Sequence, residues 1–222
     1  MKTLAWMLIA TAAGLAGCTP SYRVRVNTYS ELDGPLDQGA RIYVAVDPNS
    51  ENPILRRQIA SKIRDLLSGD GYHPVETPQG AAYTLAFEMG IDSQQVMDYA
   101  PMSRSFGGFF GGGRYGRGFG MGWGYSTYVP YVETVYNHWL RMKLYSMKDA
   151  SPNPENDKSV RLSDRQTVWL GEAMVGTESP EFREAVNCLL VGCIQYLGVD
   201  TEEWVSITIK RSDPRIQGIT TE

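Results

Sequence analysis

Histidine, cysteine and net positive charge are all scarce in this chain. Its 222 residues include 2 His and 3 Cys, and its 21 Lys and Arg stand against 25 Asp and Glu, a formal net charge of −4. The acidic balance, with a pI near 5.3, excludes a generally basic nucleic-acid binder. Mean hydropathy is −0.29, and no apolar run reaches the roughly 20 residues of a membrane-spanning helix, which excludes a polytopic membrane protein.

The shortage of histidine also limits the catalytic chemistry that can be expected. A histidine general base would have to be His73 or His138, which are far apart in the sequence and have no Cys or His at metal-ligand spacing. The nucleophile motif G-x-S-x-G is absent as well. We therefore expect no catalytic residues, no metal site and no cofactor.

The N-terminal 18 residues combine one positive charge with a short apolar stretch. Lys2 precedes an uncharged run over residues 4–15, which has the length of a signal peptide rather than of a transmembrane helix. The run ends in Leu15-Ala16-Gly17-Cys18, which resembles the lipobox of bacterial lipoproteins. The resemblance implies cleavage between Gly17 and Cys18 and a diacylglyceryl group on the Cys18 thiol. The alternatives are an ordinary secretory signal with a coincidental cysteine, or a short anchor helix.

The residue after the cysteine bears on the destination of such a lipoprotein. Gram-negative lipoproteins retained in the inner membrane commonly carry Asp there, whereas this chain has Thr19, so the resemblance implies the inner leaflet of the outer membrane, facing the periplasm. Two or three acyl chains on one residue anchor a protein stably. Removal of residues 1–17 takes away only Lys2 and changes the net charge from −4 to −5, so the acyl chains, not the overall charge, would hold the protein to the membrane.

The rest of the chain has the patterns of one folded domain. After a signal peptide at 1–17 and a lipidated tether at 18–21, we expect a single α+β domain over 22–211 and a polar C-terminal tail over 212–222. Apolar residues that alternate with polar ones predict strands. These fall at 22–26, 41–46, 72–75, 83–91, 127–136, 138–147, 166–175 and 204–209.

Two amphipathic helices are expected between the strands. One begins at Asn52-Pro53 and stops at Gly69, and the other begins at Ser179-Pro180 and stops before Gly198. The first carries Arg57, Lys62, Arg64 and Asp65 opposite its apolar face. Asp65 and the lack of Trp or Phe indicate a solvated surface rather than a membrane-surface helix. Because many strands are adjacent in sequence, we expect a mainly antiparallel sheet with both helices packed on one face.

A glycine-rich excursion at 105–125 interrupts the domain with ten glycines among aromatic and arginine residues. Its G-x-G-x-x-G spacing is not a dinucleotide site, because so many glycines cannot begin the helix that this fingerprint requires. It is either a long flexible hairpin tip or an adhesive surface for a protein partner, a glycan or a membrane, and no nucleic-acid partner is expected. The candidate interaction residues are Phe106, Phe109, Phe110, Arg114, Tyr115, Arg117, Phe119, Trp123 and Tyr125.

Two cysteines, Cys188 and Cys193, remain after Cys18 is acylated. Five residues along a helix separate two Cα atoms by roughly 8.6 Å, which is too far for a disulfide. Helical rotation places Cys193 on the apolar face and Cys188 on the polar one. We expect two free thiols, with Cys193 buried and Cys188 partly accessible.

Taken in order along the chain, these features resemble a widespread family of bacterial envelope lipoproteins that carry a domain of unknown function. The resemblance rests on the lipobox, Gly71-Tyr72 after the first helix, the glycine-rich insertion and the strand Val168-Trp169-Leu170-Gly171. It departs in the long loop at 149–164 and in the strand at 204–209. The resemblance implies no catalytic residues. We expect a lipid-anchored, periplasm-facing protein that binds or scaffolds an envelope protein partner; the alternative is a carrier for a small apolar ligand or lipid.

Overall fold

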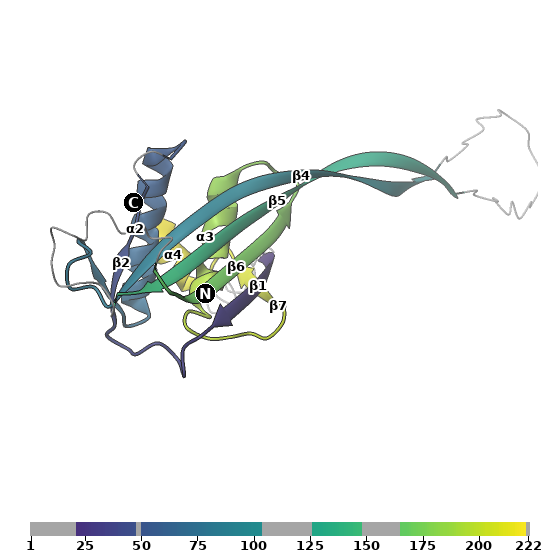
Figure 1. Cartoon of the computed structure of the whole chain (residues 1–222). Coiled ribbons are helices and arrows are strands. Elements are labelled where there is room, and N and C mark those ends of the chain that lie inside the picture. The colour runs from purple at the N-terminus through teal and green to yellow at the C-terminus, as the bar shows by residue number, and fades with distance from the viewer. Residues whose placement is uncertain (1–20, 48–49, 104–125, 148–164, 221–222) are drawn as a thin grey trace, which may run out of the picture. The chain divides into compact units, whose positions relative to one another are not determined.

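The computed structural model describes residues 21–47, 50–103, 126–147 and 165–220 (Figure 1). The chain divides into two compact units: the first comprises Met1–Asp92 and Tyr136–Glu222, and the second comprises Ser93–Val135. The second unit is wider than the excursion predicted at 105–125, because it also includes strand residues on either side. The predicted signal peptide at 1–17 and the glycine-rich segment at 105–125 lie outside the described residues.

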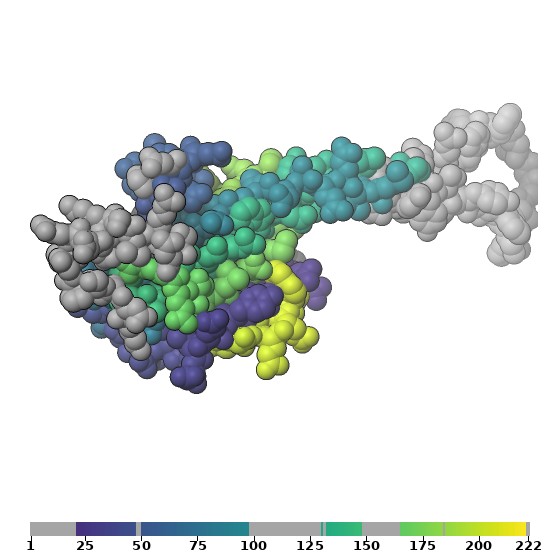
Figure 2. Space-filling view, viewed as in Figure 1, coloured from purple at the N-terminus to yellow at the C-terminus, as the bar shows by residue number. Residues whose placement is uncertain are grey.

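In the described part of the chain, seven strands form one sheet with the order β3-β2-β4-β5-β6-β1-β7. The strands are β1 (Ser21–Ser30), β2 (Arg41–Val44), β3 (His73–Val75), β4 (Tyr83–Ser103), β5 (Ser126–Ser146), β6 (Thr167–Thr177) and β7 (Val205–Lys210). The first strand lies between β6 and the last, so segments from the two ends of the described chain lie side by side (Figure 2).

The α+β class is confirmed, but the expected mainly antiparallel arrangement is wrong, because the sheet is mixed. β2 pairs in parallel with both β3 and β4, while β1 pairs antiparallel with β6 and β7, and β5 antiparallel with β6. The helix between β2 and β3 explains the first parallel pair, since a crossover connection returns the chain to the same end of the sheet.

The two strands that enter the second unit are longer than predicted. β4 continues past the expected end at residue 91 to Ser103, and the two strands expected at 127–136 and 138–147 are one strand, β5. From Tyr136 to Leu144, β5 runs in an unbroken antiparallel register with β6. Asn137 pairs with Gly176 within that ladder, so the polar residue does not end the strand.

Among the described residues, three helices cover one face of the sheet: α2 (Pro53–Gly69), α3 (Phe182–Ile194) and α4 (Pro214–Thr220). Each contacts the other two, and α2 and α3 also contact strands, which places all three on the same side. The predicted start of α2 is confirmed, because the Asn52 side chain accepts a hydrogen bond of 3.1 Å from the backbone N–H of Leu55. α3 begins at Phe182, later than the expected Ser179-Pro180.

The predicted polar tail at 212–222 is wrong for residues 214–220, which form α4. Although this segment is mostly polar, Ile216 and Ile219 lie three residues apart on one helical face and are buried. They belong to the same hydrophobic cluster as the buried residues of α2 and α3. The tail therefore extends the core instead of leaving it.

The expected exposure of Cys188 is also wrong. Its side chain is only 1% exposed and that of Cys193 is fully buried. The prediction assumed that the polar face of α3 meets solvent, but α3 contacts α2 and α4 as well as the sheet. Neither Cys188 nor Cys193 forms a disulfide, as expected from their spacing.

Burial leads to a prediction about thiol reactivity. Burial, with a smaller contribution from the negative charge of Glu172, raises the pKa of the Cys193 thiol, and burial also keeps reagent from Cys188. We expect both to react with iodoacetamide at least about 100-fold more slowly than the exposed thiol of a Ser212→Cys variant, and at equal rates only in denaturant. Mass spectrometry of peptides from labelled native protein measures this. Rapid native labelling at Cys188 would show that α3 is not covered there.

Candidate functional site

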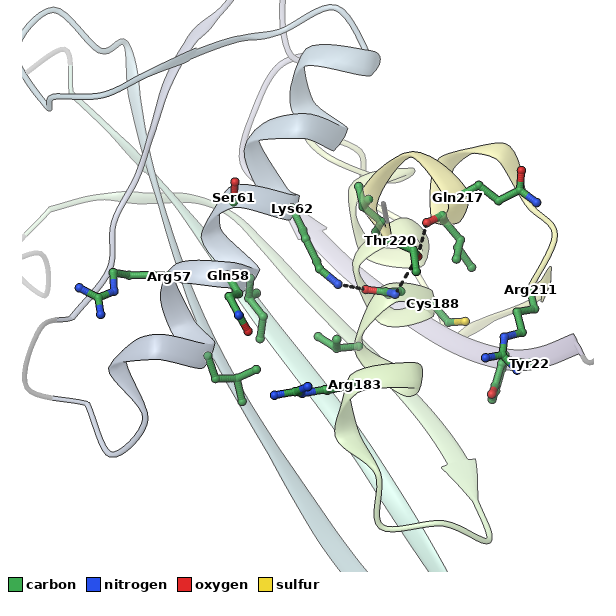
Figure 3. Close-up of a pocket in the computed structure, with 16 residues that line it drawn as sticks. Tyr22, Arg57, Gln58, Ser61, Lys62, Arg183, Cys188, Arg211, Gln217 and Thr220 are labelled. Atoms are coloured by element: carbon green, nitrogen blue, oxygen red, sulfur yellow. Dashed lines mark hydrogen bonds between the residues drawn. The ribbon is translucent and has the colours of Figure 1, made fainter. Parts of the chain in front are cut away.

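A groove lies between α2, α3 and α4 in the first unit, and we call it the helix groove (Figure 3). It has a volume of about 770 Å³ and reaches Tyr22 at the beginning of β1. This volume falls within the 300–1,000 Å³ typical of small-molecule sites.

One side of the helix groove is aliphatic. Leu55 and Ile59 lie one turn apart on α2, so the same helical face that packs on the core also borders the groove. Val186 on α3, and Ile216 and Ile219 on α4, complete this wall. All of these except Leu55 are at most 6% exposed, so they form a fixed apolar wall rather than loose surface side chains.

The other side is cationic. Arg57, Lys62, Arg183 and Arg211 line the helix groove, and none of its described lining residues is Asp or Glu. Figure 3 shows Lys62 extending from α2 toward α3, with Arg183 in the space between the two helices, whereas Arg57 points away from it in this view. Lys62 and Arg183 therefore define the charged centre of the groove.

Hydrogen bonds hold Lys62 in place and connect the three helices. Its Nζ donates to Oδ1 of Asn187 on α3 at 2.9 Å, and Asn187 Nδ2 donates to Oγ1 of Thr220 on α4 at 3.4 Å. Asn187 is 7% exposed. Burial lowers the pKa of Lys62, and the positive charge of Arg183 lowers it further. The groove thus brings together two cations without a carboxylate between them.

Sequence reasoning treated this region as ordinary solvated surface. Lys62 and Arg64 were expected on the exposed face of the first helix, yet both are partly buried. The sequence signal that could have found the groove is a pair of isoleucines, Ile216 and Ile219, in the supposed tail. They indicate a third helix, and a third helix leaves the polar face of α2 bordered by protein.

The residues singled out from the sequence do not meet in this groove. Gly17 and Cys18 lie outside the described residues, as do all nine aromatic and arginine residues proposed for the glycine-rich loop. The loop therefore remains a prediction, as does the acylation of Cys18.

The two histidines lie apart in the sheet. His73 is exposed in β3, and His138 is fully buried in β5, with β2 and β4 between those strands. The Nε2 atom of His138 lies 2.9 Å from Oγ1 of Thr177 and 3.0 Å from the carbonyl oxygen of Ser179, which fixes the ring inside the fold. Within the described ranges, no group of three or more His, Cys, Asp or Glu residues could hold a metal ion.

Asp213 fixes the helix that forms the outer wall of the groove. Its Oδ1 accepts a hydrogen bond of 2.9 Å from the backbone N–H of Arg215 at the beginning of α4, and its Oδ2 lies 3.1 Å from Nη2 of Arg215. The hydrogen bond from the Arg215 side chain lowers the pKa of Asp213. The carboxylate is therefore stabilised in the folded protein.

Asp213→Ala should lower the free energy of unfolding by about 1 kcal/mol at neutral pH, the usual effect of losing a helix cap. Because the pKa of Asp213 is lower in the folded than in the unfolded chain, its contribution is fully present above the ordinary carboxyl pKa and is lost as pH falls through the folded value. Urea unfolding at about pH 7 and about pH 3 should show a smaller deficit at the lower pH. Glu203→Ala is the control for removal of an exposed carboxylate; an equal deficit at both pH values would contradict this role.

Within the part of the chain that the structure describes, no helix is both long and apolar enough to cross a membrane.

The comparisons with known proteins assign no family: no family model and no curated protein matches this sequence. Two structures of the PelC dodecamer from Paraburkholderia phytofirmans, one of them a point variant, are similar at 13% and 11% identity and a TM-score of 0.41 each. They cover 79% and 78% of this chain and 98% and 99% of their own. A PDZ domain protein from Parabacteroides distasonis is similar at 12% identity and a TM-score of 0.48, over 90% of this chain and 42% of its own.

Proposed function

We propose that this chain is a lipid-anchored, periplasm-facing protein of the bacterial cell envelope that acts by binding, and that the helix groove is its ligand site. The observation that carries the binding role is the composition of that groove, whose lining combines aliphatic side chains with cations. The lipobox resemblance at residues 15–18 supports the anchor, and Thr19 after the cysteine supports the outer-membrane location. Of the two functions expected from the sequence, the groove favours the second, a binding module for a small apolar ligand or lipid.

The chemistry of the groove supports binding rather than turnover. Its described lining holds two sets of side chains with distinct roles, the cations of Lys62 and Arg183 and the aliphatic side chains of α3 and α4, but no histidine. Cys188 lines it too, but that thiol is 1% exposed. We therefore propose a site that holds its ligand through charge and apolar contact and leaves it chemically unchanged.

The test is the composition of the protein as purified. The mature protein is extracted from the envelope in a neutral detergent, washed, denatured and analysed by mass spectrometry for small molecules. A ligand present at near one copy per chain, and lost when Val186→Trp fills the groove, supports the proposal. Absence of any stoichiometric small molecule, together with unchanged composition in Val186→Trp, contradicts a ligand-binding function.

A second candidate function, docking of an envelope protein, is favoured by the second unit. Its described residues include Val96, Met97 and Val132, whose side chains are 40%, 65% and 59% exposed. Apolar side chains in such positions are typical of interaction surfaces, and they flank the aromatic loop predicted at 105–125. Crosslinking in intact cells should then capture one envelope protein with the wild type and lose it with Met97→Asp. Equal capture by both forms would exclude this surface.

A further inference from the structure

We propose that the helix groove binds a membrane amphiphile with a phosphate head and an aliphatic chain, the phosphate lying between Lys62 and Arg183 and the chain against Val186, Ile216 and Ile219. This inference rests on the proposed function, because it names the ligand class of the same groove. It follows from three observations: the charges in the groove, its apolar wall and its place in the chain relative to Cys18.

The two cations of the helix groove favour an anionic ligand. Lys62 and Arg183 repel each other across the groove, as the lowered pKa of Lys62 reflects. Of the three donors of Lys62, one is taken by Asn187, while Arg183 has no hydrogen bond or ion pair with the described residues. A phosphate between them would accept hydrogen bonds from both and neutralise the repulsion, and such charge-assisted bonds are among the strongest in proteins.

The aliphatic lining of the groove favours a ligand that has an apolar part in addition to its anionic group. Val186, Ile216 and Ile219 are 2%, 6% and 5% exposed and border the same hollow as the two cations. A soluble phosphate would leave most of the volume of about 770 Å³ to water. An aliphatic chain would instead bury its own methylenes against these side chains, multiplying affinity about fourfold for each buried methylene.

The position of the groove along the chain indicates where such a molecule comes from. Tyr22 lines the groove and follows Cys18 by four residues, which span at most about 14 Å when fully extended. Acyl chains on Cys18 would therefore hold the groove close to the lipid head groups. Since the net charge of the mature chain is −5, the local cations of the groove, not a general attraction, must provide the recognition.

The experiment is a calorimetric titration of the mature full chain, in a neutral detergent at fixed concentration, with hexyl phosphate below its micelle concentration. Hexyl phosphate should bind, at least about 100-fold more tightly than inorganic phosphate because of its methylenes, and hexyltrimethylammonium should not bind. Lys62→Gln and Arg183→Ala should each weaken binding about tenfold or more. Arg23→Ala, which removes an exposed cation outside the groove, should change it less than about twofold.

Thermal unfolding of each variant tests whether the variant is still folded. Arg183 is exposed and unbonded within the described residues, so Arg183→Ala should fold normally even if Lys62→Gln loosens the contact with Asn187. Equal affinity of Arg183→Ala and wild type, or binding of the cationic probe, would overturn the phosphate site. Equal affinity for inorganic and hexyl phosphate would assign the site to soluble phosphate and overturn the membrane source. If a neutral small molecule co-purifies while hexyl phosphate fails to bind, this inference fails and the proposed binding function stands.

Discussion

Gly171→Ala should lower the free energy of unfolding by about 3 kcal/mol, a loss of about 10 °C in melting temperature for a chain of this size. A Cβ at position 171 would lie 2.6 Å from Cζ2 of Trp169, closer still to its Cη2, and 2.7 Å from Sγ of Cys193. Real Cβ atoms do not approach other atoms so closely, so one of the neighbours would have to move.

Neither neighbour can move cheaply. Trp169 is 1% exposed, and its indole N–H lies 3.1 Å from the carbonyl oxygen of Tyr196 and 3.2 Å from that of Val199. Cys193 is fully buried on α3, against the sheet. Displacing the ring would break its hydrogen bonds inside the core, which costs more than the added methyl group can return.

Two other glycines serve as controls, and urea or thermal unfolding measures all three variants. Gly218→Ala in α4 meets nothing within 4 Å and should leave stability unchanged or raise it by up to about 1 kcal/mol, since alanine favours helix. Gly90→Ala meets the ring of Trp139, which is only half-buried and can give way, so its cost should be smaller than that of Gly171→Ala. A melting temperature of Gly171→Ala within about 2 °C of wild type would refute the packing of Trp169 over this glycine.

Cys18→Ser should abolish membrane anchoring. On the proposed reading of residues 15–18, the thiol forms the thioether that carries the acyl chains, and a hydroxyl in its place cannot do so. Metabolic labelling with radioactive fatty acid should fall to background, and the protein should accumulate unprocessed or be exported poorly. The effect should be close to complete, because a single residue carries all the acyl chains that hold the protein.

Cys188→Ser is the matched control, since it removes a thiol that is buried in α3. It should retain full labelling, with a stability loss from the buried hydroxyl as its only effect. Normal fatty-acid labelling of Cys18→Ser would contradict the anchor and would remove the argument that places the helix groove near a membrane.

Local sequence signals predicted the helices and strands well where the groups that start or end an element are its neighbours in the sequence. Asn52 and Pro53 start α2 because one supplies the capping oxygen and the other needs no N–H partner, and both properties are visible in the sequence. Gly198, with a φ of 78°, ends the turn after α3 as expected of a glycine past a helix. The glycine of the Trp169-Leu170-Gly171 motif was recognised, but its reason was not: the ring of Trp169, two residues away on the same face of β6, lies over it, and Cys193 of α3 approaches it in a tertiary contact.

Pairings and sites that depend on distant segments could not be predicted in the same way. Alternation is the same in both kinds of ladder, so the pattern of β2 alone does not show that it pairs in parallel with β3 and β4. The helix predicted between β2 and β3 was the sequence signal for a parallel pair, and it was not used. The helix groove needs α4 to cover the polar side of α3, and α4 offers only two buried isoleucines in seven residues. Because the sequence analysis did not predict α4, it expected the side chains of Lys62 and Cys188 to be exposed to solvent.

Native mass spectrometry of the wild-type protein, released from cell envelopes in a neutral detergent, tests the lipid anchor on Cys18 and the ligand of the helix groove most directly. We predict a chain that begins at Cys18, carries covalent acyl groups, and holds one non-covalent molecule with the mass of a phosphate-bearing lipid. The same measurement on the Lys62→Gln, Arg183→Ala double variant should show the acylated chain without that molecule. A chain without acyl groups would contradict the lipid anchor. An acylated chain whose groove is empty in wild type and double variant alike would contradict the lipid ligand of the groove.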